Sequence, residues 1–281
     1  MDEMNNENNI SENSTENMNV DAEQSYDAVL ENQKAKQNPK FNCEGTLFTF
    51  FGAFGVVFMC FLLIFQIWLT PIQVVGRSML PTINTSATSD SDDEHCDIVY
   101  YNKDSSYQND DIVIVSNEEQ QYIKNTTNHK VDFFIKRVIA CPGQTITFFL
   151  TDVKQTGLIQ NYYYDFVVKD KDGNTINLDD SYQTEEMFFS EIEYITSSST
   201  WFKELFARIA NDQIENIEDR TAEITLKENE YFVMGDNRNN SDDSRVLGLI
   251  DYSDIAGCVK LHIPYGTSLL QAIWLKFISL F

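Results

Sequence analysis

The chain has three stretches with different hydrophobic patterns. Residues 1 to about 44 are rich in Asn, Glu and Ser and contain few apolar side chains. Leu47–Leu69 then carries no charged residue and is dominated by Phe, Leu, Ile, Val and Gly. From about residue 71 onwards, short apolar runs alternate with polar turns. Alternation with a period of two predicts β-strands, whereas the continuous apolar run predicts one long helix.

The uncharged run is long enough to cross a membrane. Its 23 helical residues would rise about 1.5 Å each and so span about 35 Å, more than the roughly 30 Å of a bilayer's hydrocarbon core. The alternative is a buried core helix, but such a helix rarely runs this far without a polar face. We therefore predict a transmembrane helix at residues 45–70, with Trp68 near the interface.

The segments on either side of this helix set the predicted topology. Residues 1–44 cannot bury enough apolar surface to offset their ordering entropy, which predicts a disordered acidic tail. The positive-inside rule places the basic flank of a span in the cytoplasm. Three lysines precede the run and one arginine follows it closely: Lys34, Lys36, Lys40 and Arg77. The prediction is a single-pass protein of the cell membrane, with a cytoplasmic N-terminus and the rest extracytoplasmic.

The remainder of the chain is predicted to be mainly β. Its main domain comprises residues 71–150 and 228–268, with a polar loop at 84–94. Residues 151–227 form an inserted, smaller and partly helical subdomain, because Trp201, Leu205, Phe206 and Ile209 recur at helical spacing. Leu269–Phe281 is apolar but short for a span, which favours a segment that lies on a surface or packs on the domain. The predicted strands are Asp97–Tyr101, Asp111–Val115, Val131–Ile139, Thr145–Leu150, Tyr162–Val168, Glu230–Met234 and Ala256–Ile263.

Composition excludes several classes of function. A net charge of −24 argues against a nucleic-acid partner, because phosphate contacts require an excess of Lys and Arg. The five cysteines show no CxxC and no Cys/His spacing suited to zinc, and the three histidines sit in no recognisable constellation. No metal and no cofactor are therefore expected. A disulfide between two of Cys96, Cys141 and Cys258 stays open.

Candidate chemistry lies in Ser78 and Lys136. A serine is a poor nucleophile at neutral pH unless a base takes its proton, and no histidine is placed to do so. Lys136 shares a strand face with Phe134 and Val138, where loss of solvation would lower its pKa and favour the neutral amine. Such a lysine can act as a general base. The alternative is a strand lysine whose ammonium reaches water.

Three motifs together resemble a known family. Gly76–Thr82, Lys136–Gly143 and Gly235–Arg245 look like the signature boxes of bacterial type I signal peptidases, and they appear in family order after an apolar anchor. Gln108–Val113 resembles a further box, with Asp110 where glycine is usual. The similarity covers roughly residues 45–150 and 228–265. It implies a β-rich signal-peptidase-like domain.

The resemblance also implies roles for individual residues. Ser78 would be the nucleophile and Lys136 the general base, with Ser241 hydrogen-bonded to the lysine amine to orient it. The backbone N–H of Ser78 would stabilise the oxyanion, whereas Gly76 offers no side-chain hydroxyl as a second donor. Asp243 and Arg245 would form a buried ion pair, and Asp236 and Asn237 would help hold that loop. Shallow substrate pockets would be lined by Val74, Met79, Ile83, Phe134 and Ile135, for which ordinary core packing is the alternative.

The implied function is a membrane-bound serine endopeptidase that removes N-terminal signal peptides from exported preproteins after small residues, at A-x-A-like sites. Its partners would be secretory preproteins and membrane lipid, with the export translocon as a further candidate. Archaeal and endoplasmic-reticulum signal peptidases use histidine as the base, which Lys136 argues against. A repressor-type self-cleaving protease would be cytoplasmic and lack the anchor. A membrane-tethered binding protein is disfavoured by the intact Ser78, Lys136 and Ser241.

Overall fold

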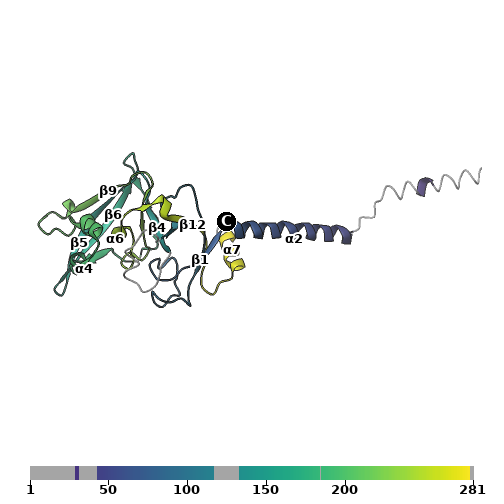
Figure 1. Cartoon of the computed structure of the whole chain (residues 1–281), viewed down its shortest axis with the longest axis horizontal. Coiled ribbons are helices and arrows are strands. Elements are labelled where there is room, and N and C mark those ends of the chain that lie inside the picture. Colours follow the sequence, from purple (N-terminus) through teal and green to yellow (C-terminus); the bar gives the residue numbers. More distant parts are fainter. Residues whose placement is uncertain (1–28, 32–42, 117–132, 184, 279–281) are drawn as a thin grey trace, which may run out of the picture. The chain divides into compact units, whose positions relative to one another are not determined.

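The computed structural model describes residues 29–31, 43–116, 133–183 and 185–278 (Figure 1). The chain divides into two units between Ile64 and Phe65. Almost all of the predicted tail lies outside the described residues, so its disorder stays a prediction.

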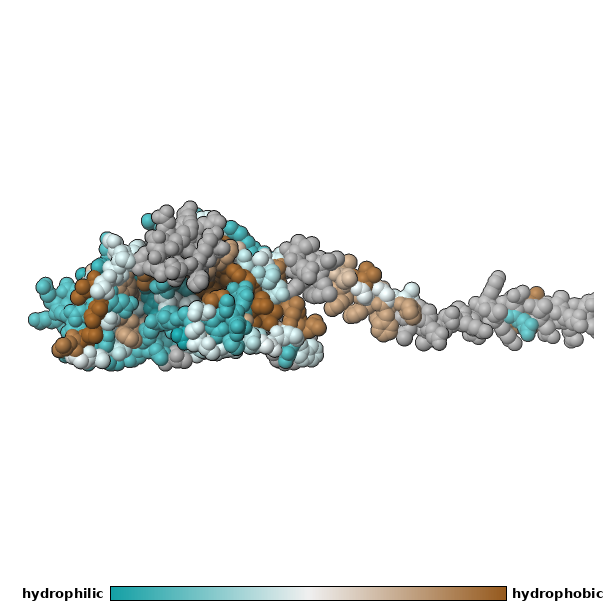
Figure 2. Space-filling view, turned by 60° about the horizontal axis from the view of Figure 1, so that its bottom comes forward, coloured by the Kyte–Doolittle hydropathy of each residue, from teal (hydrophilic) through white to brown (hydrophobic). Residues whose placement is uncertain are grey.

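Helix α2 spans Cys43–Trp68 and so contains nearly all of the uncharged run. Every side chain described from Phe48 to Cys60 is exposed, and Trp68 is 68% exposed. Figure 2 shows hydrophobic residues along the described part of this helix. Within the described residues, no helix meets both the length and the hydropathy that a membrane crossing requires. The transmembrane assignment therefore stays a prediction.

The described strands form two sheets, and every strand pair in them is antiparallel. The larger sheet has seven strands in the order β1-β2-β12-β3-β4-β10-β11. The strand bounds, in chain order, are β1 Thr70–Gln73, β2 Ile98–Asn102, β3 Ile112–Ser116, β4 Phe133–Ala140, β10 Glu230–Met234, β11 Ile250–Asp251 and β12 Ile255–Ile263.

The smaller sheet has five strands, with the path β7-β6-β5-β9 and with β8 paired to β6. Its strands are β5 Thr145–Thr156, β6 Ile159–Lys169, β7 Thr175–Ile176, β8 Phe188–Ser190 and β9 Thr221–Thr225. The helices of this part of the chain are α4 Glu191–Thr196, α5 Thr200–Phe206, η1 Ile217–Asp219, α6 Ser244–Leu247, η2 Tyr252–Asp254 and α7 Leu269–Ile278.

All seven predicted strands occur. Alternation of apolar and polar residues gives a strand one buried face, and this pattern can be recognised in the local sequence. Glu230–Met234 matches β10 at both ends. The first two residues of Val131–Ile139 lie outside the described part, and β4 ends one residue later than predicted, at Ala140. The sequence analysis missed β1, β7, β8, β9 and β11, most of them very short. The loop predicted at 84–94 is irregular, as expected.

The two sheets share one hydrophobic core. Phe148 on β5 is fully buried, and its ring lies 5.7 Å from that of Phe232 on β10 and 5.6 Å from that of Phe206 on α5. Figure 1 shows the β5-β6-β9 sheet beside β4. The boundary expected between residues 150 and 151 falls inside strand β5. The 151–227 region packs into the same core as the motif-bearing strands. The sequence predicts an inserted, smaller subdomain here, because the sequence alone does not show which core its aromatic residues join.

Two smaller expectations concern the C-terminus and the cysteines. Helix α7 packs on β12 through Leu269 and Ala272, while Leu270 and Trp274 are exposed, which agrees with a domain-packing segment. Cys96, Cys141 and Cys258 are free thiols, so the disulfide left open by the sequence is not formed.

The shared core predicts a large effect of truncating Phe148. Phe148→Ala should lower the free energy of unfolding by about 3–5 kcal/mol, because it removes a fully buried ring that joins the sheets. Urea unfolding followed by circular dichroism measures this, and the transition should stay single. Leu158→Ala is the control, since Leu158 is 94% exposed and should change stability by about 0.5 kcal/mol or less. Separate transitions for the two sheets would contradict a shared core.

Candidate active site

Lys136 lies on β4 and is only 3% exposed. Its Nζ contacts Ser78 Oγ at 3.0 Å and the backbone oxygen of Ile135 at 3.0 Å, and it lies 5.5 Å from the ring centre of Phe134. Burial lowers the pKa of Lys136 to about 8, although nearby carboxylates, chiefly that of Asp243, act to raise it. A larger fraction of the amine is therefore neutral at physiological pH than in an exposed lysine. Once neutral, it can accept a proton from the Ser78 hydroxyl at the same contact.

Asp236 and Asn237 tie the turn that carries Ser78 to the end of β10. Both carboxylate oxygens of Asp236 accept from the Arg137 guanidinium, at 2.7 and 2.6 Å, and one also accepts from the Thr82 hydroxyl. The backbone N–H of Asn237 donates to Ser78 O at 3.0 Å, and the side-chain amide of Asn237 donates to Arg77 O at 3.1 Å. These contacts hold the backbone of Ser78 beside β4.

Asp243 and Arg245 form a buried ion pair, with distances of 2.8 Å from Nε and from Nη2 to the two carboxylate oxygens. Burial acts to raise the pKa of Asp243, but the guanidinium of Arg245 outweighs it and keeps that pKa below its ordinary value. Asp243 also accepts from the backbone N–H of Gly235, and Arg245 donates to Arg238 O and to the Tyr164 hydroxyl. The pair thus fixes the shape of the loop after β10.

The hydrogen bond expected between Ser241 and the lysine amine is not formed. Ser241 Oγ is buried and has no partner among the described residues, whereas Lys136 Nζ is met by Ser78 and Ile135. Ser241 instead packs on Gly235, where an added Cβ would lie 2.3 Å from Ser241 Oγ and 2.5 Å from Ser78 O. Only glycine therefore lets Ser241 and the turn that carries Ser78 approach from both sides. An orienting role for Ser241 stays a prediction.

A second anchor of the turn that carries Ser78 centres on Asn84, which the sequence analysis did not single out. Asn84 is fully buried in a left-handed conformation, with φ of 63°. Its side-chain amide donates to the carbonyls of Val74 and Gly76, at 2.6 and 2.9 Å, and so closes the turn around Ser78. It also accepts from the backbone N–H of Asp97 at 2.8 Å.

Asp97 links this anchor to the C-terminal strand. The carboxylate is buried and accepts from the backbone N–H of Asn84 at 2.7 Å, and it lies 2.7 Å from His262 Nε2 at the end of β12. The backbone N–H of Tyr265 donates to its other oxygen at 2.8 Å. His262 thus serves a structural contact, in keeping with its lack of any recognised motif.

The departure from the family pattern at Asp110 has a structural explanation. Asp110 adopts a φ of 70°, a region that glycine enters freely and that Asp tolerates better than most residues. Its backbone oxygen accepts from Arg137 Nη1 at 3.0 Å. Glycine at this position would satisfy the same turn without strain.

The five residues expected to line substrate pockets do not share one environment. Val74, Met79, Ile83 and Ile135 form one buried cluster and are each at most 6% exposed. Phe134 is half-buried and packs against a different cluster. Their role in substrate binding stays a prediction, and ordinary core packing accounts for four of them as they stand.

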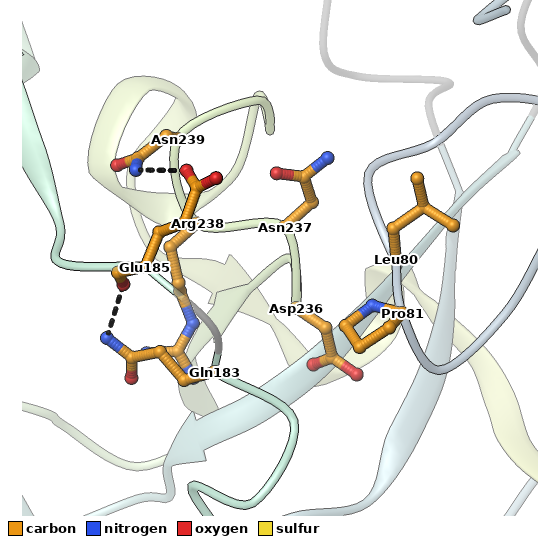
Figure 3. Close-up of a pocket in the computed structure, with 8 residues that line it drawn as sticks. All are labelled: Leu80, Pro81, Gln183, Glu185, Asp236, Asn237, Arg238 and Asn239. Atoms are coloured by element: carbon orange, nitrogen blue, oxygen red, sulfur yellow. Dashed lines mark hydrogen bonds between the residues drawn. The ribbon is translucent and has the colours of Figure 1, made fainter. Parts of the chain in front are cut away.

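A pocket of about 210 Å³ lies beside the turn that carries Ser78, and none of those five residues lines it. Figure 3 shows Leu80 and Pro81 on one side, facing Gln183 and Glu185 on the other. The remaining lining residues come from the loop after β10 and are Asp236, Asn237, Arg238 and Asn239. The 151–227 region therefore supplies one wall of this pocket. Within the described residues, no cluster of three or more His, Cys, Asp or Glu side chains could hold a metal ion.

The chain matches the family model described as "Signal peptidase, peptidase S26" over residues 47–263. The chain belongs to this family. It is 32% identical over 154 residues to the signal peptidase I of Aquifex aeolicus (strain VF5), covering 48% of this chain and 57% of that protein. It is 26% identical over 167 residues to the signal peptidase I of Buchnera aphidicola subsp. Acyrthosiphon pisum (strain APS), covering 50% of this chain and 52% of that protein.

The chain therefore spans about half the length of the curated relatives it matches. Among solved structures, a signal peptidase I from Enterococcus faecalis V583 is similar at 19% identity, covering 56% of this chain and 98% of that one. Its TM-score of 0.26 is too low to establish a shared fold.

Other functional candidates were missed for different reasons. Thr82 and Arg137 lie within two of the family motifs, so their position was a usable signal. Asn84, Asp97 and Tyr164 lie outside every motif and acquire partners only through folding. No local pattern distinguishes them from other polar residues.

Asn84→Gly separates the side-chain anchor from the backbone conformation, because glycine keeps the positive φ without strain. It should lower the free energy of unfolding by about 2 kcal/mol, since three buried hydrogen bonds are lost. Amide protons of residues 74–84 should also exchange faster by mass spectrometry. Asn229→Gly is the matched control, because Asn229 is exposed and has a φ of 67°. Equal effects of the two variants would refute a clamping role for Asn84.

Proposed function

We propose that this chain is a serine endopeptidase that removes N-terminal signal peptides from exported preproteins, cleaving after small residues. The observation that carries the proposal is the 3.0 Å contact between Lys136 Nζ and Ser78 Oγ in a buried setting. Membership of the signal peptidase family and the matches to two signal peptidase I proteins support the reaction class.

The mechanism begins when neutral Lys136 accepts the proton of the Ser78 hydroxyl. The serine oxygen attacks the carbonyl carbon of the scissile peptide bond, and the backbone N–H of Ser78 faces the developing oxyanion. Protonated Lys136 then gives its proton to the departing amine, which leaves an ester on Ser78. Water, deprotonated by the same lysine, attacks this ester and releases the signal peptide. Gly76 supplies no hydroxyl to the oxyanion, so a second donor must come from elsewhere.

We further propose that the enzyme acts at the outer face of the cell membrane, anchored by residues 45–70. The uncharged run of 23 residues, the exposed apolar side chains of α2 and the lysines before it support this topology. The substrates would then be secretory preproteins emerging next to membrane lipid, with the export translocon as a candidate partner. The strongly acidic chain is unsuited to nucleic acid.

A histidine-based mechanism is disfavoured by the surroundings of the described histidines. His95 contacts Asp92 and His262 contacts Asp97, so each is held by a carboxylate in place of the serine. His129 lies outside the described residues. The burial of Lys136 beside Ser78 also counts against a non-catalytic binding protein, because an unused lysine would be expected to reach water.

The dyad assignment is tested by Ser78→Ala and Lys136→Ala. Each should reduce cleavage of a preprotein with an Ala-x-Ala junction by about a thousandfold or more, since each removes a group needed for bond formation. The assay uses the full chain in detergent or liposomes, and the new N-terminus of the product is sequenced. Ser89→Ala and Lys154→Ala are controls at exposed positions and should cleave like wild type. Turnover retained in either dyad variant would refute the assignment.

The pH dependence follows from the lowered pKa of Lys136. The base must be neutral, so activity should rise with pH, by about tenfold between pH 7 and pH 9 for a pKa of about 8. The measurement is kcat for a peptide substrate across this range, with circular dichroism to verify folding at each pH. A rate that is flat or falls above pH 7 would be incompatible with lysine as the base.

A further inference from the structure

The 151–227 region touches the active site at several points of one loop. We define the catalytic loop as residues 235–248, which follow β10 and contain the third family motif. The region's contacts to this loop come from β6, from the segment before β8, and from α5. An insertion without a role at the site would not require these hydrogen bonds to the catalytic loop.

Tyr182 lies between two arginines of the site and is 8% exposed. Its ring centre is 4.3 Å from the guanidinium carbon of Arg137 and 5.4 Å from that of Arg238. Its hydroxyl also accepts from Arg238 Nη2 at 2.6 Å. Because Arg137 follows Lys136 directly and pairs with Asp236, the ring of Tyr182 restrains both the base-bearing strand and the catalytic loop.

Tyr164 completes the surroundings of the buried ion pair. Its hydroxyl accepts from Arg245 Nη1 at 2.8 Å, while the rest of that guanidinium is bonded to Asp243 and to Arg238 O. Tyr164 and Arg245 are both buried, at 3% and 5% exposure. Removing the hydroxyl would leave a charged N–H buried without an acceptor, which is costly.

Helix α5 and the residue before it hold the end of the catalytic loop. Trp201 Nε1 donates to Ser244 O at 2.8 Å, and Ser199 Oγ donates to Val246 O at 2.6 Å. These carbonyls belong to the short helix α6, where the Ser244 carbonyl also accepts from the backbone N–H of the C-cap residue Gly248 at 3.2 Å. Side chains of the 151–227 region thus form hydrogen bonds to the end of the catalytic loop as well as to its middle.

We propose that the 151–227 region is a working part of the active centre, in which Tyr164 and Tyr182 are positioning residues that hold the catalytic loop against Ser78 and Lys136. This inference rests on the peptidase function proposed above. The region acts through the loop and through Arg137 on β4, and among the described residues it makes no hydrogen bond to Ser78 Oγ or Lys136 Nζ. It also explains why its strands share a core with the motif-bearing sheet.

The test compares Tyr164→Phe and Tyr182→Phe with Tyr162→Phe. Tyr162 is the matched control, because it lies on the same strand as Tyr164, is 2% exposed, and bonds Asp212 and Gln160 away from the catalytic loop. Hydrogen exchange by mass spectrometry is measured on residues 235–248 of the full chain in detergent. Cleavage of a preprotein-derived peptide gives kcat and KM for each variant, and the pH profile of kcat gives the midpoint of the lysine titration.

We expect exchange of residues 235–248 to be faster in the Tyr164 and Tyr182 variants and unchanged in the Tyr162 variant. Their kcat should fall by about tenfold with KM nearly constant, as loss of one buried charged hydrogen bond implies. The midpoint should move to higher pH, because a looser loop readmits water to Lys136. Tyr182→Leu, which removes the ring as well, should enlarge all three effects.

Two results would overturn the proposal. One is unchanged exchange and kcat in the Tyr164 and Tyr182 variants, including Tyr182→Leu. The other is an equal loss in Tyr162→Phe, which would indicate general destabilisation. If wild type cleaved no preprotein, the proposed function would fail, while the exchange comparison would still decide whether these tyrosines hold the loop.

Discussion

The site depends on keeping one lysine amine out of water next to one serine hydroxyl. Lys136 is almost completely buried, and that burial lowers its pKa to about 8 and makes the neutral amine accessible. The same burial would be unfavourable if the amine had no partners, but Nζ meets Ser78 Oγ and Ile135 O. Strand β4 supplies the amine, and the turn after β1 supplies the hydroxyl. The contacts of Asp236, Asn237 and Asn84 help to hold these two elements in place.

Two buried ion pairs carry out most of that holding. Arg137 with Asp236 joins β4 to the end of β10, and Asp243 with Arg245 shapes the loop beyond it. Buried pairs of this kind add little net stability over apolar packing, but losing one partner leaves an uncompensated charge and is strongly destabilising. Gly235 sits between the two pairs and leaves room for Ser241 on one side and for the turn that carries Ser78 on the other. The geometry of the site is therefore set mainly by these two ion pairs and by the absence of a side chain at Gly235.

The second sheet takes part in this arrangement, because its aromatic core continues into the first. Phe148 contacts Phe232 across the two sheets, and Tyr164, on the strand paired with that of Phe148, reaches the guanidinium of Arg245. A region that carries no recognisable motif is thereby packed and hydrogen-bonded to the loop that does. The active centre that we propose is thus larger than the family motifs.

The sequence by itself determined the long uncharged run, the positions of most strands and the pairing of a candidate serine with a candidate lysine. Each of these features can be recognised in a short stretch of sequence: alternation sets strand faces, and Ser78 and Lys136 each lie in a contiguous motif. Only the tertiary structure decided that Ser241 makes no hydrogen bond to Lys136, that Asn84 closes the turn around Ser78, and that the 151–227 region joins the main core. Contacts of this kind join residues that are distant in the sequence, such as Arg77 and Asn237, which are 160 positions apart. They depend on strand order, register and the paths of loops, which no local pattern of hydrophobic and polar residues encodes.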